Sequence, residues 1–440
     1  MTAETIDTLV IGAGQAGLAM SYWLGRAGRP HLVLERGRIA ERWRSERWDS
    51  LAFQFPNWSL ELPGFLHPSA SPEGFAGRDD IVDFVESYAC HIRAPVRTGV
   101  TVRRLRGRQA RLVAETDAGP IVASNVVVAT GPYQRPVIPE ASKALSGVVQ
   151  LHARSYRNPQ TLPPGGILIV GAGASGTQIA EDLIRDGRSV WLAVGSHRRV
   201  PRRYRGRDFH HWEFALGEWD RPTASRDIRE PPPLLTGIDG GRDMDLRELA
   251  HLGATLTGRL AAICDGVARF KPDLKDSLAK GDAHYHRFRA AIDAYATGNG
   301  LELPAPDPVP LRPDPACVTH PVTQLDLAAS GISAVIWATG YALELDWIDL
   351  PVFSQRGEPL HTDGVSPVPG LYFLGLPWLS KRKSTLLSGV GEDAERLASH
   401  IASRTSNAGC SYSAPRSDSG LLVLRRTLNS GGAHESDARF

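Results

Sequence analysis

The sequence predicts an α/β protein made of two units with parallel sheets, the second inserted into the first. One observation is the length, because 440 residues exceed what a single compact core usually holds. Another is an apolar run followed by Gly-x-Gly-x-x-Gly, which occurs at 9–17 and again at 167–176. A third is an apolar run ending in Ala-Thr-Gly, at 126–131 and again at 334–340. Together these repeats indicate two copies of one strand, loop and helix unit.

The first glycine-rich loop has the order of a dinucleotide site. A strand over 9–11 runs into Gly12, which permits the tight turn, and Gly14 lets the backbone approach a pyrophosphate. Gly17 packs the following helix on the strand, and that helix is expected to stop at Gly28. The free N–H groups at the helix N-terminus suit phosphate oxygens. A chance glycine turn in another α/β protein is the alternative.

An acidic residue follows the next strand. The strand over 31–34 ends in Glu35, where a carboxylate can accept hydrogen bonds from ribose hydroxyls. The residues expected to contact the first nucleotide are Gly12, Gly14, Gln15, Ala16, Gly17, Glu35 and Arg36.

The second copy follows the first in register, with Gly171 lying 159 residues after Gly12. The expected contacts are Gly171, Gly173, Ala174, Ser175 and Gly176. Its second strand, 190–194, lacks the acid, because Glu35 corresponds to Val194. A carboxylate repels a 2′-phosphate and arginine attracts one, so Arg198 and Arg199 predict NADPH at this site. The first site is then of FAD or NAD type. The alternative is a solvated basic loop, since arginines continue to Arg207.

The two Ala-Thr-Gly strands place small residues where the chain passes close to a cofactor and crosses between domains. The expected contacts are Ala129, Thr130, Gly131, Thr339 and Gly340. Their spacing exceeds that of the glycine loops by 50 residues, which predicts an insertion at about 200–316 with one helix at about 275–297. We therefore expect a first domain of 1–145 and 341–403, a second of 146–340, and a disordered tail of 404–440.

Composition excludes several classes. A net charge of +2, with 22% charged and 42% hydrophobic residues, is typical of a soluble globular protein and argues against nucleic-acid or membrane partners. No apolar run is long enough to span a membrane, and 1–7 leaves no room for a signal peptide, so the cytoplasm is expected. Cys90, Cys264, Cys317 and Cys410 form no C-x-x-C pair, and no metal site or redox disulfide is expected.

With these motifs in place, the chain resembles the two-domain flavoprotein monooxygenases that include flavin-containing monooxygenases. A bacterial branch of that group is resembled by the segments 41–44, 47–51, 56–58 and 200–208. The resemblance implies FAD in the first site and NADPH in the second. It also implies a C4a-(hydro)peroxide on the flavin, with O2 and a small molecule bearing a nucleophilic N or S, or a carbonyl, as substrates. A homodimer is one oligomeric state to test.

The resemblance also nominates residues. Trp43, Trp48 and Trp58 could wall the flavin or equally be core residues, and Arg42 is expected to contact the same cofactor. Asn57 would hydrogen-bond the peroxide or lie in a turn. A helix opening near 388, with Gly391 and Glu392 in its first turn, would point its N-terminus at the flavin or be an ordinary acid-capped helix.

A linker segment over 147–152 resembles the monooxygenase fingerprint and nominates His152 as catalytic. It departs from that fingerprint, since Leu145 replaces an aromatic residue and four residues separate Gly147 from His152. This departure argues against ketone oxygenation, and His152 could instead be a structural linker histidine. Two alternatives stay open for the whole chain: an NADPH-dependent flavoprotein reductase or oxidase without oxygen transfer, and a flavin redox sensor without turnover.

Overall fold

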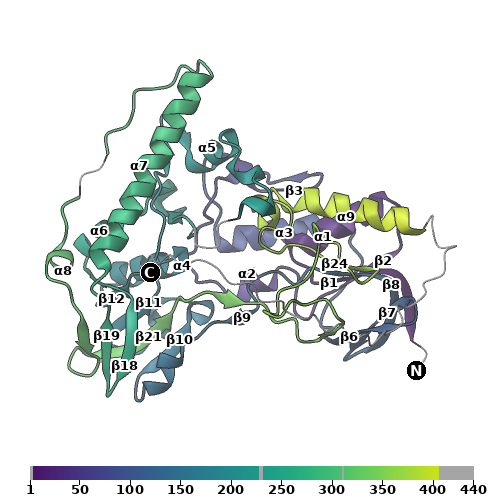
Figure 1. Cartoon of the computed structure of the whole chain (residues 1–440), viewed down its shortest axis with the longest axis horizontal. Coiled ribbons are helices and arrows are strands. Elements are labelled where there is room, and N and C mark those ends of the chain that lie inside the picture. The colour runs from purple at the N-terminus through teal and green to yellow at the C-terminus, as the bar shows by residue number, and fades with distance from the viewer. Residues whose placement is uncertain (1–2, 227–230, 310–311, 406–440) are drawn as a thin grey trace, which may run out of the picture.

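The computed structural model describes residues 3–226, 231–309 and 312–405. They form two parallel-rich sheets that lie toward opposite ends of the long axis (Figure 1). The strands of the first sheet come from 4–128 and 348–373, and those of the second lie between them in the chain, from 149 to 337. The predicted fold class, two Rossmann-like α/β units with one inserted in the other, is confirmed.

The first sheet is built around β1 (Glu4–Ile11) and β8 (Gly119–Val128), which pair in parallel and whose C-terminal parts are buried and mostly apolar. Its order is β23 (Ile348–Asp349), β6 (Val102–Arg108), β7 (Arg111–Thr116), β8 (Gly119–Val128), β1 (Glu4–Ile11), β2 (His31–Leu34) and β5 (Val96–Arg97), with β24 (Leu371–Phe373) also beside β8. The helices α1 (Gln15–Arg26), α3 (Arg78–His91) and α9 (Val390–Thr405) share one apolar core with these strands.

The second sheet repeats this arrangement. Its order is β10 (Val149–His152), β21 (Ile332–Trp337), β11 (Gly166–Val170), β12 (Val190–Ala193) and β17 (Ala254–Thr257), all parallel. Helix α4 (Ala174–Arg185) follows β11 as α1 follows β1. Strand β17 lies inside the stretch that we expected to be an insertion. The sequence did not predict this strand, because four residues of mixed polarity give no clear strand signal.

The rest of the 200–316 stretch contains α-helices, which we call the helical cover, two hairpins and part of a small antiparallel sheet. The expected helix near 275–297 is α7, which runs over Leu274–Gly298 and rises beside the second sheet in green (Figure 1). With it are α5 (Phe209–Ala215), α6 (Leu246–His251) and the hairpins β13–β14 (Arg203–Tyr204, Arg207–Asp208) and β15–β16 (Leu235–Thr236, Arg242–Asp243). A three-stranded sheet joins β18 (Leu260–Cys264), β19 (Val267–Phe270) and β20 (Gln324–Asp326).

Short elements complete the described chain: α2 (Glu41–Ser45), β3 (Glu61–Leu62), β4 (Phe65–Leu66), β9 (Arg135–Pro136), α8 (Ala316–Thr319) and β22 (Tyr341–Ala342). Among the residues described, no helix has both the length and the apolar composition needed to cross a membrane. The expected disordered tail lies outside the described residues from 406 onward, whereas 404 and 405 close α9.

Candidate nucleotide-binding sites

The two glycine-rich loops have the same backbone shape. Gly12 has a φ of +110° and Gly171 a φ of +109°, a region that favours glycine. A Cβ at Gly12 would lie 2.6 Å from the carbonyl oxygen of Ala129, and one at Gly171 would lie 2.5 Å from that of Ala338. Each loop is therefore pressed against the Ala-Thr-Gly strand of its own sheet, and only glycine fits.

The third glycine of each loop lets the helix approach the turn. A Cβ at Gly17 would lie 1.8 Å from the carbonyl oxygen of Gly12. The equivalent distance from Gly176 to Gly171 is 1.9 Å. Any side chain here would push the helix away from the strand. These two glycines therefore allow each helix N-terminus to lie close to its glycine turn.

The middle glycine of each loop faces open space. Gly14 and Gly173 are the N-caps of α1 and α4, neither has a side-chain cap, and a Cβ on either would have no neighbouring atom within 4 Å. The helical ladders begin with Leu18 N to Gly14 O and Thr177 N to Gly173 O, both 3.0 Å. The amides of 15–17 and 174–176 thus have no acceptor within their helices, as a pyrophosphate site requires.

A cavity of about 540 Å³ opens over the first loop, within the usual range for small-molecule sites. Eleven of the residues predicted from the sequence line it: Gly12, Gly14, Gln15, Ala16, Glu35, Arg36, Arg42, Trp43, Ala129, Thr130 and Gly131. They come from β1, α1, β2, α2 and the end of β8, so the fold brings together segments separated by more than 90 residues.

Glu35 stands at the end of β2 on the wall of this cavity. Its carboxylate accepts hydrogen bonds from the backbone amides of Ala13 at 2.9 Å and Gly37 at 2.8 Å. A carboxylate has about four lone-pair positions, so two remain for ribose hydroxyls. The glycine loops and this carboxylate fit an adenine dinucleotide at the first site.

The Ala-Thr-Gly strands lead into the connection between the two sheets. Beyond them, β9 and β22 pair antiparallel, with Pro136 opposite Tyr341. Thr130 accepts a hydrogen bond from the Gln134 amide at 2.7 Å, and the Thr339 hydroxyl donates to the carbonyl of Val137. Both threonines therefore brace the crossing segments as well as lying next to a glycine loop.

His152 is a linker residue with both ring nitrogens engaged. It is 4% exposed, its Nδ1 accepts from the Arg154 amide at 3.1 Å, and its Nε2 lies 3.1 Å from the Gly340 carbonyl oxygen. Burial lowers the pKa of His152, against a smaller raising effect of the Gly340 hydrogen bond. A neutral ring with two backbone partners is placed for holding the linker. It has no free nitrogen for acid–base chemistry.

Two other nominated residues lie away from the first cavity. Trp48 is 3% exposed and packs in the core of the second sheet, so it is corrected from cofactor wall to core residue. Asn57 is also absent from the cavity lining, and its Nδ2 donates to Ser69 Oγ and to Ser71 O, both at 3.0 Å. Its Oδ1 is buried without a protein partner.

The helix start at Gly391 and Glu392 does not line the first cavity either. The Gly391 carbonyl accepts from the Trp23 indole at 3.1 Å, which ties α9 to α1. The Glu392 carboxylate pairs with Lys381 at 2.9 Å and also with Lys383. This pairing holds the first turn of α9 to the segment before it.

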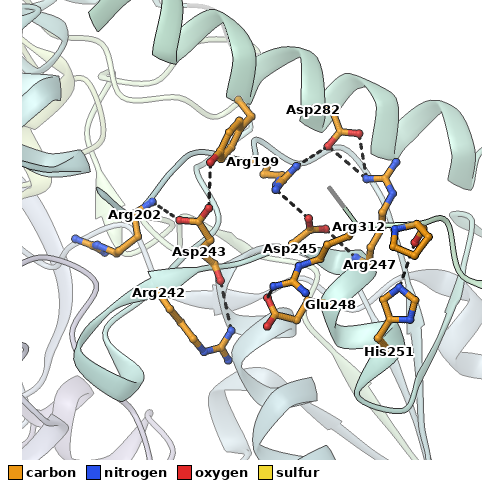
Figure 2. Close-up of polar contacts among 12 residues, drawn as sticks. Arg199, Arg202, Arg242, Asp243, Asp245, Arg247, Glu248, His251, Asp282 and Arg312 are labelled. Atoms are coloured by element: carbon orange, nitrogen blue, oxygen red, sulfur yellow. Dashed lines mark hydrogen bonds and ion pairs between the residues drawn. The ribbon is translucent and has the colours of Figure 1, made fainter. Parts of the chain in front are cut away.

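The arginines expected to meet a 2′-phosphate point into the helical cover. Arg199 pairs with Asp245 at 3.0 Å and Asp282 at 2.9 Å, and Figure 2 shows both carboxylates around its guanidinium. Arg198, 7% exposed, lies 3.8 Å from the buried carboxylate of Glu213. Because carboxylates of the insertion engage both arginines, the sequence-based assignment of Arg198 and Arg199 to the nucleotide is corrected.

Several residues on the cavity wall were not predicted as cofactor contacts from the sequence. They are Glu46, Arg47, Tyr133, Gln134, Glu344 and Trp347. Glu46 is 6% exposed and pairs with Arg42 at 3.0 Å and with Arg154 at 2.7 Å, which joins the cavity to the linker. Spacing alone could not show these contacts, since they depend on how the two sheets meet.

Comparisons with known proteins agree with this geometry. A model of the pyridine nucleotide-disulphide oxidoreductase family matches residues 9–205. A CzcO-like oxidoreductase of Geobacillus kaustophilus is 34% identical over 403 residues, covering 90% of this chain and 98% of that protein. A flavin monooxygenase structure from Stenotrophomonas maltophilia, a double mutant, has a TM-score of 0.65 at 18% identity over 91% of this chain and 99% of its own.

A third similar structure is that of OTEMO in complex with FAD and NADP, with a TM-score of 0.54 at 16% identity over 92% of this chain and 87% of that one. These structural similarities establish a shared fold, that of FAD/NAD(P)-dependent oxidoreductases. The sequence similarity over nearly the whole length establishes the family. The chain is an enzyme that belongs to the CzcO-like oxidoreductases.

Proposed function

We propose that this enzyme is an NADPH-dependent, FAD-containing monooxygenase. In this proposal it transfers one oxygen atom from O2 to a small molecule with a nucleophilic nitrogen or sulfur, or a carbonyl. The observation that carries the proposal is the pair of equivalent glycine loops, each with an uncapped helix N-terminus, in one chain. Structural neighbours include a flavin monooxygenase, and OTEMO in a complex with FAD and NADP.

In this proposal the first site holds FAD. The amides of 15–17 would bind its pyrophosphate, Glu35 its ribose, and the half-buried Trp43 would flank the ring system. The second site, over 171–176, would hold NADPH in the same way. When bound, the flavin accepts a hydride from NADPH and supplies electrons to O2.

The chain's own task is to orient the two nucleotides and to keep water out. The Gln15 amide donates to the Thr385 carbonyl at 2.6 Å, which joins the first loop to the segment before α9. The Arg47 guanidinium lies 5.4 Å from the Trp43 ring and 5.7 Å from the Tyr133 ring, so cation–π contacts steady one wall of the cavity. No acid–base dyad is required of the protein in this chemistry.

Oxygen-isotope labelling tests the proposal. FAD-loaded enzyme is given NADPH, 18O2 and a panel of a tertiary amine, a thioether and a cyclic ketone. A product that carries one 18O atom, with NADPH consumed in step, supports oxygen transfer. NADPH oxidation that yields only hydrogen peroxide with every substrate contradicts it and favours a reductase or oxidase. An enzyme that is never reduced by NADPH would instead favour a flavin sensor.

A further inference from the structure

The second nucleotide site needs a residue that distinguishes NADPH from NADH. In sites of this type that residue lies near the end of the second strand, which is β12 here. The residue that corresponds to Glu35 is Val194, which is fully buried. Arg198 and Arg199, the nearest cations in sequence, face carboxylates of the insertion. A cation that serves this position must therefore come from another strand.

Strand β17 brings such a cation to the same edge of the sheet. It pairs in parallel with β12, with Ala193 opposite Thr257, and the Val194 amide continues the ladder to the Thr257 carbonyl at 3.0 Å. The two strands therefore end at the same edge of the sheet. A Cβ built on Gly195 would lie 4.0 Å from Cγ of Arg259, so the Arg259 stem lies against the loop that ends β12.

Arg259 is held in place but still reaches solvent. Its side chain is 48% exposed. Asp273 accepts from the backbone amide of Arg259 at 3.0 Å and pairs with its Nε at 2.9 Å. A guanidinium has five N–H donors, and a carboxylate at Nε leaves the terminal nitrogens able to grip a phosphate in bidentate fashion.

The neighbouring charges favour an anion as well. Lys271 is exposed, and its amide donates to the Arg259 carbonyl at 2.8 Å, so the backbones of these two cationic residues lie side by side. In nucleotide sites of this type the adenosine ribose lies at the end of the second strand, next to the glycine loop. Arg259 stands at that strand end in this chain.

The geometry points to Arg259 as the residue that recognises the 2′-phosphate of NADPH. This inference rests on the proposed second nucleotide site and does not depend on oxygen transfer. It replaces the assignment that the sequence gives to Arg198 and Arg199. The selected ligand class is an adenine nucleotide with a phosphate on its 2′-oxygen.

Calorimetric titration of the FAD-loaded enzyme with adenosine 2′,5′-bisphosphate and with 5′-AMP tests this directly. We expect wild type to bind the bisphosphate more tightly. Arg259→Ala should reduce that preference by about 10- to 100-fold, as expected for one charge-assisted contact, with 5′-AMP affinity unchanged. Arg259→Lys should restore part of the preference, because it keeps the charge and loses the fork.

Arg269→Ala is the matched control, because Arg269 is an exposed arginine on β19, which pairs with β18, the strand that follows Arg259. It should leave both affinities at the wild-type value. An undiminished preference in Arg259→Ala, or equal affinity of wild type for the two nucleotides, would overturn the assignment. Failure of wild type to bind either nucleotide would overturn the second site as well. An unchanged 5′-AMP affinity in each variant shows that it has folded.

Discussion

The Nε2 atom of His152 lies 3.1 Å from the carbonyl oxygen of Gly340, so the linker histidine is bonded to the glycine that ends the second Ala-Thr-Gly strand. Its ring also meets the ring of Tyr341 edge-on, with centroids 4.9 Å apart. The residue thus joins the two crossing segments at the point where the second sheet meets the first. A change at His152 should act through the placement of the second nucleotide site.

This placement predicts a specific kinetic result for His152→Gln. Burial lowers the pKa of His152, which disfavours the protonated ring, and both ring nitrogens have backbone partners. We expect slower reduction of the bound flavin by NADPH with no change in the shape of its pH dependence between about pH 6 and 8. Anaerobic stopped-flow reduction measures this. Loss of a pH limb in the variant would identify His152 as an acid–base catalyst instead.

The open faces of Gly14 and Gly173 predict separable losses. Gly14→Asp should abolish FAD retention, because a carboxylate would stand where the pyrophosphate binds, without a clash in the protein itself. Gly173→Asp should keep FAD and abolish its reduction by NADPH. The flavin spectrum before and after anaerobic NADPH addition distinguishes the two.

Gly25→Asp is the control for charge, since Gly25 lies on α1 with equally open surroundings. It should behave as wild type in both measurements. Identical defects in Gly14→Asp and Gly173→Asp would contradict the assignment of separate sites.

The close approach of Gly12 and Gly171 to neighbouring carbonyls predicts a loss of stability on substitution. Alanine at either position combines an unfavourable positive φ with a Cβ at most 2.6 Å from an oxygen. The free energy of unfolding should fall by at least about 2 kcal/mol. Gly99→Ala, at a φ of +71° with open surroundings, should cost only about 1–2 kcal/mol. Urea unfolding of the three variants checks the order, and equal costs would refute the steric argument.

The buried ring of His210 predicts that the free energy of unfolding falls as the solution becomes acidic. The ring is stacked on Phe55 at 4.2 Å, and burial, aided by the charge of Arg202, lowers its pKa to about 3. The unfolded chain takes up this proton near pH 6.5 and the folded chain only near pH 3. The contribution of the neutral His210 ring to the free energy of unfolding is therefore complete above pH 6.5. It is lost as the pH falls from 6.5 toward 3.

Replacing this ring should make the free energy of unfolding less dependent on pH in the acid range. His210→Phe should reduce the fall in unfolding free energy by up to roughly 1.4 kcal/mol per pH unit between about pH 6 and 4. His286→Phe, at an exposed position on α7, should leave the slope as in wild type. Urea midpoints across this pH range measure it. An unchanged slope in His210→Phe would show that His210 is not buried as a neutral ring.

The glycine loops could be predicted because their requirements are local. Turn geometry at Gly12 and close packing at Gly17 belong to a few consecutive residues, and the repeat at 167–176 carries the same constraints. Strand 31–34 was predicted with its observed bounds for the same reason, since a short apolar run is bounded by turn residues and by Glu35.

Charges and aromatic rings could not be assigned in that way. One of the two carboxylates that pair with Arg199 comes from Asp282, 83 residues further along the chain, and no spacing rule predicts this contact. A tryptophan such as Trp48 looks the same in the sequence whether it lines a cavity or fills a core. Only the packing of the folded chain distinguishes the two. Arg259 reaches the end of β12 only because β17, a strand that the sequence did not reveal, lies beside it.

The central claim is that one chain binds two different dinucleotides at once. Titration of the FAD-loaded enzyme with NADP+ under calorimetry, followed by release and quantification of flavin, tests it most directly. We predict that one NADP+ binds per chain while one FAD is retained. Displacement of FAD by NADP+, or saturation with a single nucleotide in total, would contradict it.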